Sequence, residues 1–283
     1  MTVRIITDST CDLPARVVSQ LGIQVIPLFI HVGDREYLDG IDMTRAEFYE
    51  KLPSFTSHPT TAVPSLIKFR ALYDTLADEG ASEVLSIHIS TSLSAILNVA
   101  RSAAEETTSV PVTVLDSRQL SLGTGFLVQK AAEMAQAGHS VQEILPALED
   151  QIKHTHVGAA LDTLQFLRRS GRMNSVISTT GELLQIKPIL KMYDGVTGVE
   201  RVRTRKNALK RLVEMLHTYS PYEKLAFLHS EALERARALK DEVRELLPDD
   251  EIYFEVINPV LGAHIGPGVV GFVGVSKDQR CVK

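Results

Sequence analysis

The residues of this chain that are best placed to bind a small molecule carry hydroxyl groups. Ser94 follows an expected strand over 84–89 and falls in the first turn of an expected helix over 92–106. The first turn of a helix has unpaired N–H groups and a partial positive charge, which favour a bound anion. A hydroxyl there can donate to a carboxylate or accept from a carboxylic acid. The alternative is that Ser94 only caps the helix, as serine often does.

Thr61 is the second such residue. It stands shortly before Pro64, which opens another expected helix, so it too lies at a loop-to-helix junction. A cap or a turn is the alternative for this residue. Because both junctions fall in the same half of the chain, Thr61 and Ser94 are candidates for holding one acidic head group together. Ser90 and Thr91 are candidates for secondary contacts with the same head group.

His264 lies in a glycine-rich segment, 262–268, where the backbone has room to approach a ligand. It is a third candidate for the acid head group, and an ordinary turn histidine is the alternative. His154 and His156 form a weak metal pair without a third ligand, so we expect no metal and no cofactor beyond the bound ligand.

A hydrolase or acyltransferase is a competing hypothesis. Ser94 or Ser90 would be the nucleophile, and His88 or His264 would be the base, because a serine after a strand loosely resembles a nucleophile elbow. The Gly-x-Ser-x-Gly frame of that elbow is absent, however. Asp8 and Asp116 follow strands, but no Ser-His-Asp order is convincing. We therefore expect a binding protein without catalytic residues.

A basic group stands out in a chain whose net charge is −5. Its members are Arg168, Arg169, Arg172, Arg201, Arg203, Arg205, Lys206, Lys210 and Arg211. A solvated charged face is one interpretation, and a docking patch for an acidic partner or a phosphate is the other. The docking interpretation gives a further hypothesis for the function, in which the protein is an interaction module that acts through this basic group.

Strands and helices alternate in the first half of the chain. The expected strands cover 3–6, 23–32, 84–89 and 112–115, and the expected helices cover 14–21, 64–79, 92–106 and 119–136. This order predicts an α/β fold with a doubly wound parallel sheet, in which ligands bind at the carboxyl ends of the strands. The segment 33–60 is expected to be a long loop, and Asp12 is expected to cap the first helix.

The second half has a different order. Helices are expected over 161–169, 207–219 and 232–247, and strands over 186–193, 199–204, 224–229, 252–256 and 269–275. Asp194-Gly195 marks a hairpin between the first two of these strands. The pattern predicts a C-terminal α+β domain with a mixed sheet. We place the two domains at 1–156 and 157–283.

The overall composition is that of an ordinary globular protein, with 44% hydrophobic residues in 283. The negative net charge argues against nucleic acid as a partner. The two cysteines form no Cys-x-x-Cys pattern, which is typical of a reducing compartment. No apolar run approaches the length of a membrane span, so we expect a cytoplasmic protein with no membrane span.

Several segments together resemble the DegV family, whose members bind fatty acids. The matching pieces, in family order, are Ile6-Thr7-Asp8-Ser9-Thr10-Cys11-Asp12-Leu13, Pro59–Ser65, Ser86–Ser94, Asp116-Ser117-Arg118, Leu164–Arg172, Ile186-Lys187-Pro188 and Gly262–Gly268. The resemblance implies that Thr61 and Ser94 contact the fatty-acid carboxylate, with His264 close to the head group. It also implies that residues 157–283 complete a buried acyl tunnel.

Some members of this family are the acyl-carrying subunit of a fatty-acid kinase, and a separate protein phosphorylates the lipid. By resemblance, Arg172 and Arg203 are contacts for that partner or for a phosphate. The chain departs from the family pattern at Ala62, at Ser170 and at Ala95-Ile96-Leu97. We expect these departures to affect the preferred acyl chain more than the carboxylate site.

Overall fold

A four-stranded parallel sheet forms the first half of the protein, as the alternating pattern predicts. The computed structural model describes residues 2–173 and 186–277. The strand order is β2-β1-β6-β7. The strands are β1 (Val3–Asp8), β2 (Gln24–Ile26), β6 (Glu83–His88) and β7 (Val112–Asp116). The central strands β1 and β6 are covered on both faces, and all but one residue of each is buried.

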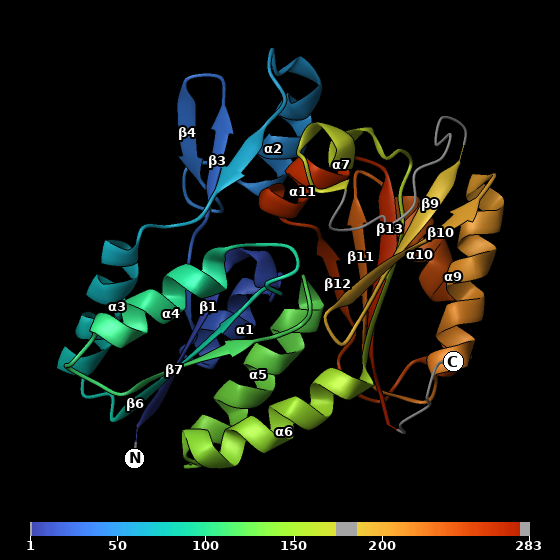
Figure 1. The fold of residues 1–283 in the computed structure, drawn as a ribbon. Helices are drawn as coiled ribbons and strands as arrows, with labels where there is room; N and C mark the ends of the chain where they lie inside the picture. The colour runs from blue at the N-terminus through green and yellow to red at the C-terminus, as the bar shows by residue number, and fades with distance from the viewer. Residues whose placement is uncertain (1, 174–185, 278–283) are drawn as a thin grey trace.

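Helices lie on both faces of this sheet (Figure 1). They are α1 (Ala15–Gln20), α3 (Leu66–Asp78), α4 (Ile96–Glu106), α5 (Leu122–Gln136) and α6 (Val141–His154). The short helix η1 (Ser9–Cys11) follows β1. Helix α5 contacts both large sheets, and its first turns are buried almost all round. A helix between two sheets has no solvent face, so it needs no polar stripe there.

A six-stranded mixed sheet forms most of the second half, with strand order β10-β9-β8-β13-β11-β12. Of the strand pairs described in this sheet, β11 and β12 are parallel and the others are antiparallel. The strands are β8 (Thr155–Ala160), β9 (Lys187–Tyr193), β10 (Val196–Val202), β11 (Tyr222–Ser230), β12 (Tyr253–Val256) and β13 (Val269–Ser276). The predicted hairpin over Asp194-Gly195 is confirmed. The proposed domain boundary at residue 156 falls near the start of β8.

The outer face of the mixed sheet is covered by α9 (Arg205–Tyr219) and α10 (Leu233–Asp241), and η3 (Arg244–Leu246) follows them (Figure 1). The expected helix over 161–169 is wrong in its extent, because β8 runs to Ala160 and α7 (Gln165–Arg169) is shorter. Among the described residues, no helix is long and apolar enough to cross a membrane.

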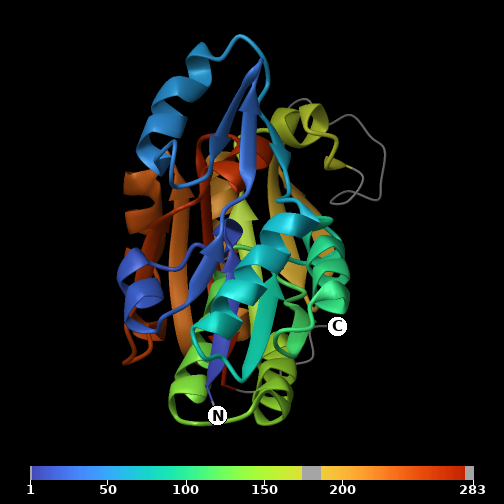
Figure 2. The ribbon, with the colours of Figure 1, turned by 90° about the vertical axis from the view of Figure 1, so that its left-hand side faces the viewer.

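A third, antiparallel sheet with the order β4-β3-β5 lies at one end of the molecule with helix α2 (Figure 1 and Figure 2). Its strands are β3 (Phe29–Val32), β4 (Arg35–Leu38) and β5 (Thr60–Ala62), and the helices are α2 (Arg45–Lys51) and η2 (Leu52–Ser54). The expectation of a structureless loop over 33–60 is therefore wrong. Strands of three or four residues are too short to show a clear alternation.

Candidate functional site

A cavity of about 410 Å³ lies where the small sheet, the parallel sheet and the mixed sheet meet. Its wall includes the loops that follow β1 and β6, at the carboxyl ends of these parallel strands, as the fold type predicts. Most of the lining is apolar. The polar exceptions are Thr10, Thr61, Ser94, Arg172 and His264. The structure thus brings the three predicted head-group residues to one cavity.

Thr61 and His264 contact each other directly. The distance from Thr61 Oγ1 to His264 Nε2 is 3.0 Å. Strand β5 positions Thr61 through its pairing with Ile30 of β3. The expected loop-to-helix junction for Thr61 is wrong, since the residue lies in a strand.

His264 belongs to the last turn of α11 (Pro259–Ile265), so its assignment to an irregular turn is also wrong. Asn258 caps this helix, because its side chain accepts a hydrogen bond from the N–H of Leu261. Two glycines near His264, Gly262 and Gly266, are explained by their surroundings and backbone conformation. A Cβ on Gly262 would lie 2.6 Å from the hydroxyl oxygen of Tyr49, and Gly266 ends the helix with a positive φ of 74°.

His264 is neutral at pH 7. Burial lowers the pKa of its ring to about 4, and the nearby charges of Arg172 and His58 act in the same direction. Its Nδ1 is buried and has no hydrogen-bond partner among the described residues. A buried N–H without a partner is rarer than an unused lone pair, which favours the tautomer with the proton on Nε2. In that tautomer Thr61 accepts from His264 and keeps its own proton for a ligand.

Ser94 lies just before α4 and not in its first turn, which corrects the expected start of that helix. Its Oγ accepts a hydrogen bond from the N–H of Ile96 at 3.3 Å. Ser94 therefore caps the start of the helix by accepting from a backbone N–H, and it also lines the cavity. The hydroxyl proton remains available to a ligand.

Ser90 and Thr91, the expected secondary contacts, are absent from the described lining of this cavity. The oxygens of Ser90 and Ser92 are 2.9 Å apart, and Thr91 donates its hydroxyl to Asp116 at 2.6 Å. Both residues thus stabilise the turn that leads to Ser94. Asp12 also differs from expectation. It is buried and held by Arg45, Ser121 and Asn258, while Pro14 occupies the N-cap position of α1.

The two arginines singled out in the sequence are separated by the structure. Arg172 lines the cavity, and its Nε donates to the carbonyl of Leu93 at 3.3 Å. It places a positive charge close enough to His264 to lower the pKa of that ring. Arg203 is exposed between β10 and α9 and does not belong to the described lining of the cavity.

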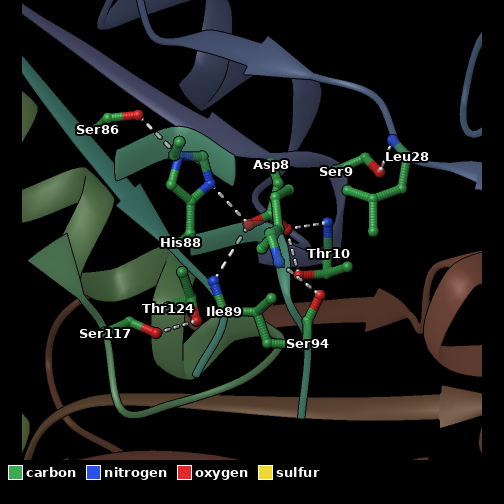
Figure 3. Close-up of polar contacts among 12 residues, drawn as sticks. Asp8, Ser9, Thr10, Leu28, Ser86, His88, Ile89, Ser94, Ser117 and Thr124 are labelled. Atoms are coloured by element: carbon green, nitrogen blue, oxygen red, sulfur yellow. Dashed lines mark hydrogen bonds and ion pairs between the residues drawn. The ribbon is translucent and has the colours of Figure 1, made fainter. Parts of the chain in front are cut away.

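A buried chain of polar side chains stands behind the cavity and was not found from the sequence (Figure 3). His88 Nδ1 lies 3.0 Å from Asp8 Oδ2, and His88 Nε2 lies 2.7 Å from Ser86 Oγ. Ser86 and His88 are two apart in one strand and therefore face the same side. Polar residues at this spacing in an otherwise apolar strand were the available signal.

The Ser86–His88–Asp8 chain has the hydrogen-bond order of a catalytic triad, but its serine is misplaced for catalysis. Ser86 is 0% exposed, lies against Tyr73, and is not in the described lining of the cavity. A nucleophile must reach the substrate, and this one cannot. Within the described residues, neither Ser94 nor Ser90 is hydrogen-bonded to a histidine.

A second apolar cavity of about 70 Å³ lies beside the first. The two cavities share the lining residues Leu120, Leu190, Leu261 and Ile265. The remaining wall of the smaller one comes largely from β8, β9 and β13 of the mixed sheet. An elongated apolar ligand with its polar end at Thr61 could extend toward it.

In the part of the chain that the structure describes, no group of three or more His, Cys, Asp or Glu residues is arranged to hold a metal ion. The ring of His156 instead stacks between Tyr193 and Tyr219, with centroid distances of 4.9 and 4.0 Å. His154 Nδ1 lies 2.8 Å from the carbonyl oxygen of Asp150.

Comparisons with known proteins agree with one another. The family model described as "Uncharacterised protein, DegV family" matches residues 2–277. A DegV domain-containing protein of Listeria innocua is 33% identical over 273 residues, which are 95% of this chain and 96% of the relative. Another, from Streptomyces coelicolor, is 35% identical over 280 residues, with coverage of 97% and 99%.

Two solved structures are similar over almost their full lengths. A fatty-acid-binding DegV family protein from Thermus thermophilus has a TM-score of 0.88 and 33% identity, covering 98% of this chain and 100% of that one. DegV from Bacillus subtilis, described as a fatty acid binding protein, has a TM-score of 0.90 and 31% identity, with the same coverage.

Proposed function

The chain belongs to the DegV family, and from this premise we propose that it is a carrier that binds one long-chain fatty acid. The carboxyl group would be held by Thr61 and Ser94, with His264 fixing the orientation of Thr61. The acyl chain would extend along the apolar wall toward the smaller cavity. Relatives that are more than 30% identical and described as fatty-acid-binding support this ligand class.

The observation that carries the proposal is the contact between Thr61 and His264 at the edge of an apolar cavity that Ser94 also lines. Two hydroxyl donors at one end of an apolar space match an amphiphile with one polar end. A neutral His264 adds no charge of its own, and the two donors can pair with the carbonyl oxygen of a fatty acid or of its acyl phosphate.

Energetics allow tight binding without a salt bridge. A sixteen-carbon acid has about 14 methylenes, and burying them is worth roughly 11 kcal/mol at ~0.8 kcal/mol each. Lost translational freedom and chain ordering offset several kcal/mol of this. The remainder, with the head-group hydrogen bonds, corresponds to a dissociation constant of about micromolar or lower.

We further propose that the bound acid is presented to a separate kinase for acyl-phosphate formation. Arg172 lines the cavity and would face a phosphate on the head group, because a guanidinium pairs well with phosphate oxygens. Arg203 is exposed outside the cavity and would contact the partner protein. In this arrangement the carrier itself supplies no nucleophile.

The alternative of a serine hydrolase or acyltransferase gains no support from the geometry. Ser94 accepts from a backbone N–H, Ser90 interacts with Ser92, and His264 contacts Thr61. A nucleophile needs a base within hydrogen-bond reach, and neither serine has a histidine there among the described residues.

Substitution of Thr61 tests the carrier proposal, with Thr60 as the matched control. Thr60 is the preceding residue of β5 and its side chain is exposed. We expect Thr61→Val to weaken binding of hexadecanoic acid about tenfold or more in isothermal titration calorimetry, and Thr60→Val to leave it unchanged. Equal binding by the wild type and Thr61→Val would contradict the assigned site, and no binding by the folded wild type would contradict the function.

A further inference from the structure

Thr10 is the polar residue of the cavity wall that the carrier proposal leaves without a role. It belongs to η1, directly after β1, and is only 1% exposed. Because it is among the lining residues, any ligand contact must come from inside the cavity. Figure 3 shows Asp8 between the ring of His88 and the hydroxyl of Thr10, with Ser94 on the side of Thr10.

The hydroxyl proton of Thr10 is committed to Asp8. The Oδ1 atom of Asp8 accepts from both the N–H and the hydroxyl of Thr10, and Oδ2 accepts from the N–H of Ile89 and from His88 Nδ1. Burial alone would raise the pKa of Asp8, but these hydrogen bonds hold it below its ordinary value. An ionised carboxylate only accepts, so all four partners must donate.

The orientation of the Thr10 hydroxyl follows from this arrangement. With its proton directed at Asp8, the Thr10 oxygen can offer only lone pairs to the cavity. Thr61 and Ser94, by contrast, each retain a proton for a ligand. The three hydroxyl groups of the described cavity wall therefore comprise two donors and one obligate acceptor.

From this arrangement of donors and acceptor we propose that Thr10 is a third head-group contact. The Asp8–His88–Ser86 chain holds the Thr10 hydroxyl as an acceptor. Thr10 therefore selects ligands whose terminal oxygen carries a proton. The inference rests on the proposed fatty-acid site. A carboxylic acid satisfies all three groups: its carbonyl oxygen accepts from Thr61 and Ser94, and its O–H donates to Thr10. An ester lacks that O–H and leaves Thr10 unpaired.

Asp8, His88 and Ser86 are positioning residues in this scheme, because none of them is in the described lining of the cavity. Their buried hydrogen bonds fix one rotamer and one proton position of Thr10. The site is thus supplied with an acceptor before the ligand arrives, which lowers the ordering cost of binding.

The test is the ratio of the dissociation constants of methyl hexadecanoate and hexadecanoic acid. It is measured for the wild type, for Thr10→Val, which keeps the shape, and for Thr10→Ser, which keeps the hydroxyl. We expect the ratio to fall about fivefold to tenfold in Thr10→Val through weaker binding of the acid, and to stay within about twofold in Thr10→Ser. The extra methyl group of the ester affects binding to all three proteins alike, so a difference in the ratio between the proteins does not come from its size.

Thr10→Ala provides a second removal of the hydroxyl if the valine variant does not fold, and its ratio should fall in the same way. An unchanged ratio in a folded Thr10→Val or Thr10→Ala variant, or a loss of discrimination in Thr10→Ser, would overturn the role of Thr10. Equal weakening of both ligands would do the same, because it indicates a purely structural effect. Failure of the wild type to bind any acid would instead refute the carrier proposal.

Discussion

The hydroxyl of Thr61 lies 3.0 Å from the ring of His264, although 203 residues separate them in the chain. One residue comes from a short strand of the small sheet, and the other comes from the last turn of α11. Their contact joins the two halves of the protein at the cavity. In the proposed carrier, the N–H of this neutral histidine would orient the Thr61 hydroxyl, and that hydroxyl would contact the acid.

The stability of the protein should decrease on acidification because of His264. The pKa of this ring is about 4 in the folded protein, against an ordinary value of 6.5. Between these values the unfolded chain binds more protons, so the free energy of unfolding falls as the pH drops from about 6.5 to about 4. We expect His264→Gln to show a shallower decrease than the wild type in urea denaturation at a series of pH values.

His156 provides a comparison for that experiment. Burial lowers its pKa to about 4 as well, but the residue stacks between two tyrosines and does not line the larger cavity. We expect His156→Gln to reduce the pH dependence of stability in the same window while fatty-acid binding is retained. If His264→Gln unfolds with the same pH dependence as the wild type, the assignment of a neutral, buried His264 is wrong.

Filling the junction of the two cavities should shorten the acyl chains that the protein accepts. Leu190 of β9 lines both cavities. We expect Leu190→Phe to weaken binding of an eighteen-carbon acid at least about tenfold and to affect a ten-carbon acid much less. Leu190→Met conserves the volume and should bind both acids as the wild type does. Uniform effects on the two acids in competition assays would place the chain elsewhere.

Arg172 should affect phosphoryl transfer without being needed to hold the lipid. We expect Arg172→Gln to bind hexadecanoic acid within about threefold of the wild type, since the acyl chain supplies most of the binding energy. Acyl-phosphate formation with a partner kinase should be largely lost. Arg168→Gln is the control, because Arg168 is exposed and absent from the described cavity lining.

The same variant has a readout that needs no kinase. Removing the charge of Arg172 should raise the pKa of His264, which can be followed through the ring protons in NMR titrations. Normal acyl-phosphate formation by Arg172→Gln would exclude Arg172 from the phosphate site. An unchanged His264 titration would show that the guanidinium is not directed at the cavity.

The sequence predicted the parallel and mixed sheets well because all of their strands except β2 and β12 have five or more residues. The parallel and mixed sheets and the hairpin at Asp194-Gly195 are all confirmed. The small sheet was missed, because β5 has three residues and β3 and β4 have four. The predicted secondary structure around Thr61 and around His264 was also wrong, although both residues line the cavity.

The residues behind the cavity depend on contacts that no local pattern specifies. Asp8 and His88 are 80 positions apart and meet only because β1 and β6 are neighbours in the parallel sheet. The sequence placed Asp8 at a strand end, which is correct, but did not pair it. Thr10 appeared only within the first segment of the family resemblance, and its proposed role follows from the direction of its hydroxyl proton.

Native mass spectrometry of the purified wild-type protein tests the central claim most directly, because it requires no assumption about the ligand. We expect a fraction of the protein to carry the mass of one long-chain fatty acid, identified after release by gas chromatography. A Thr61→Val/Ser94→Ala variant should carry far less. A folded wild-type protein that stays free of lipid after incubation with hexadecanoic acid would contradict the assignment of this protein as a fatty-acid carrier.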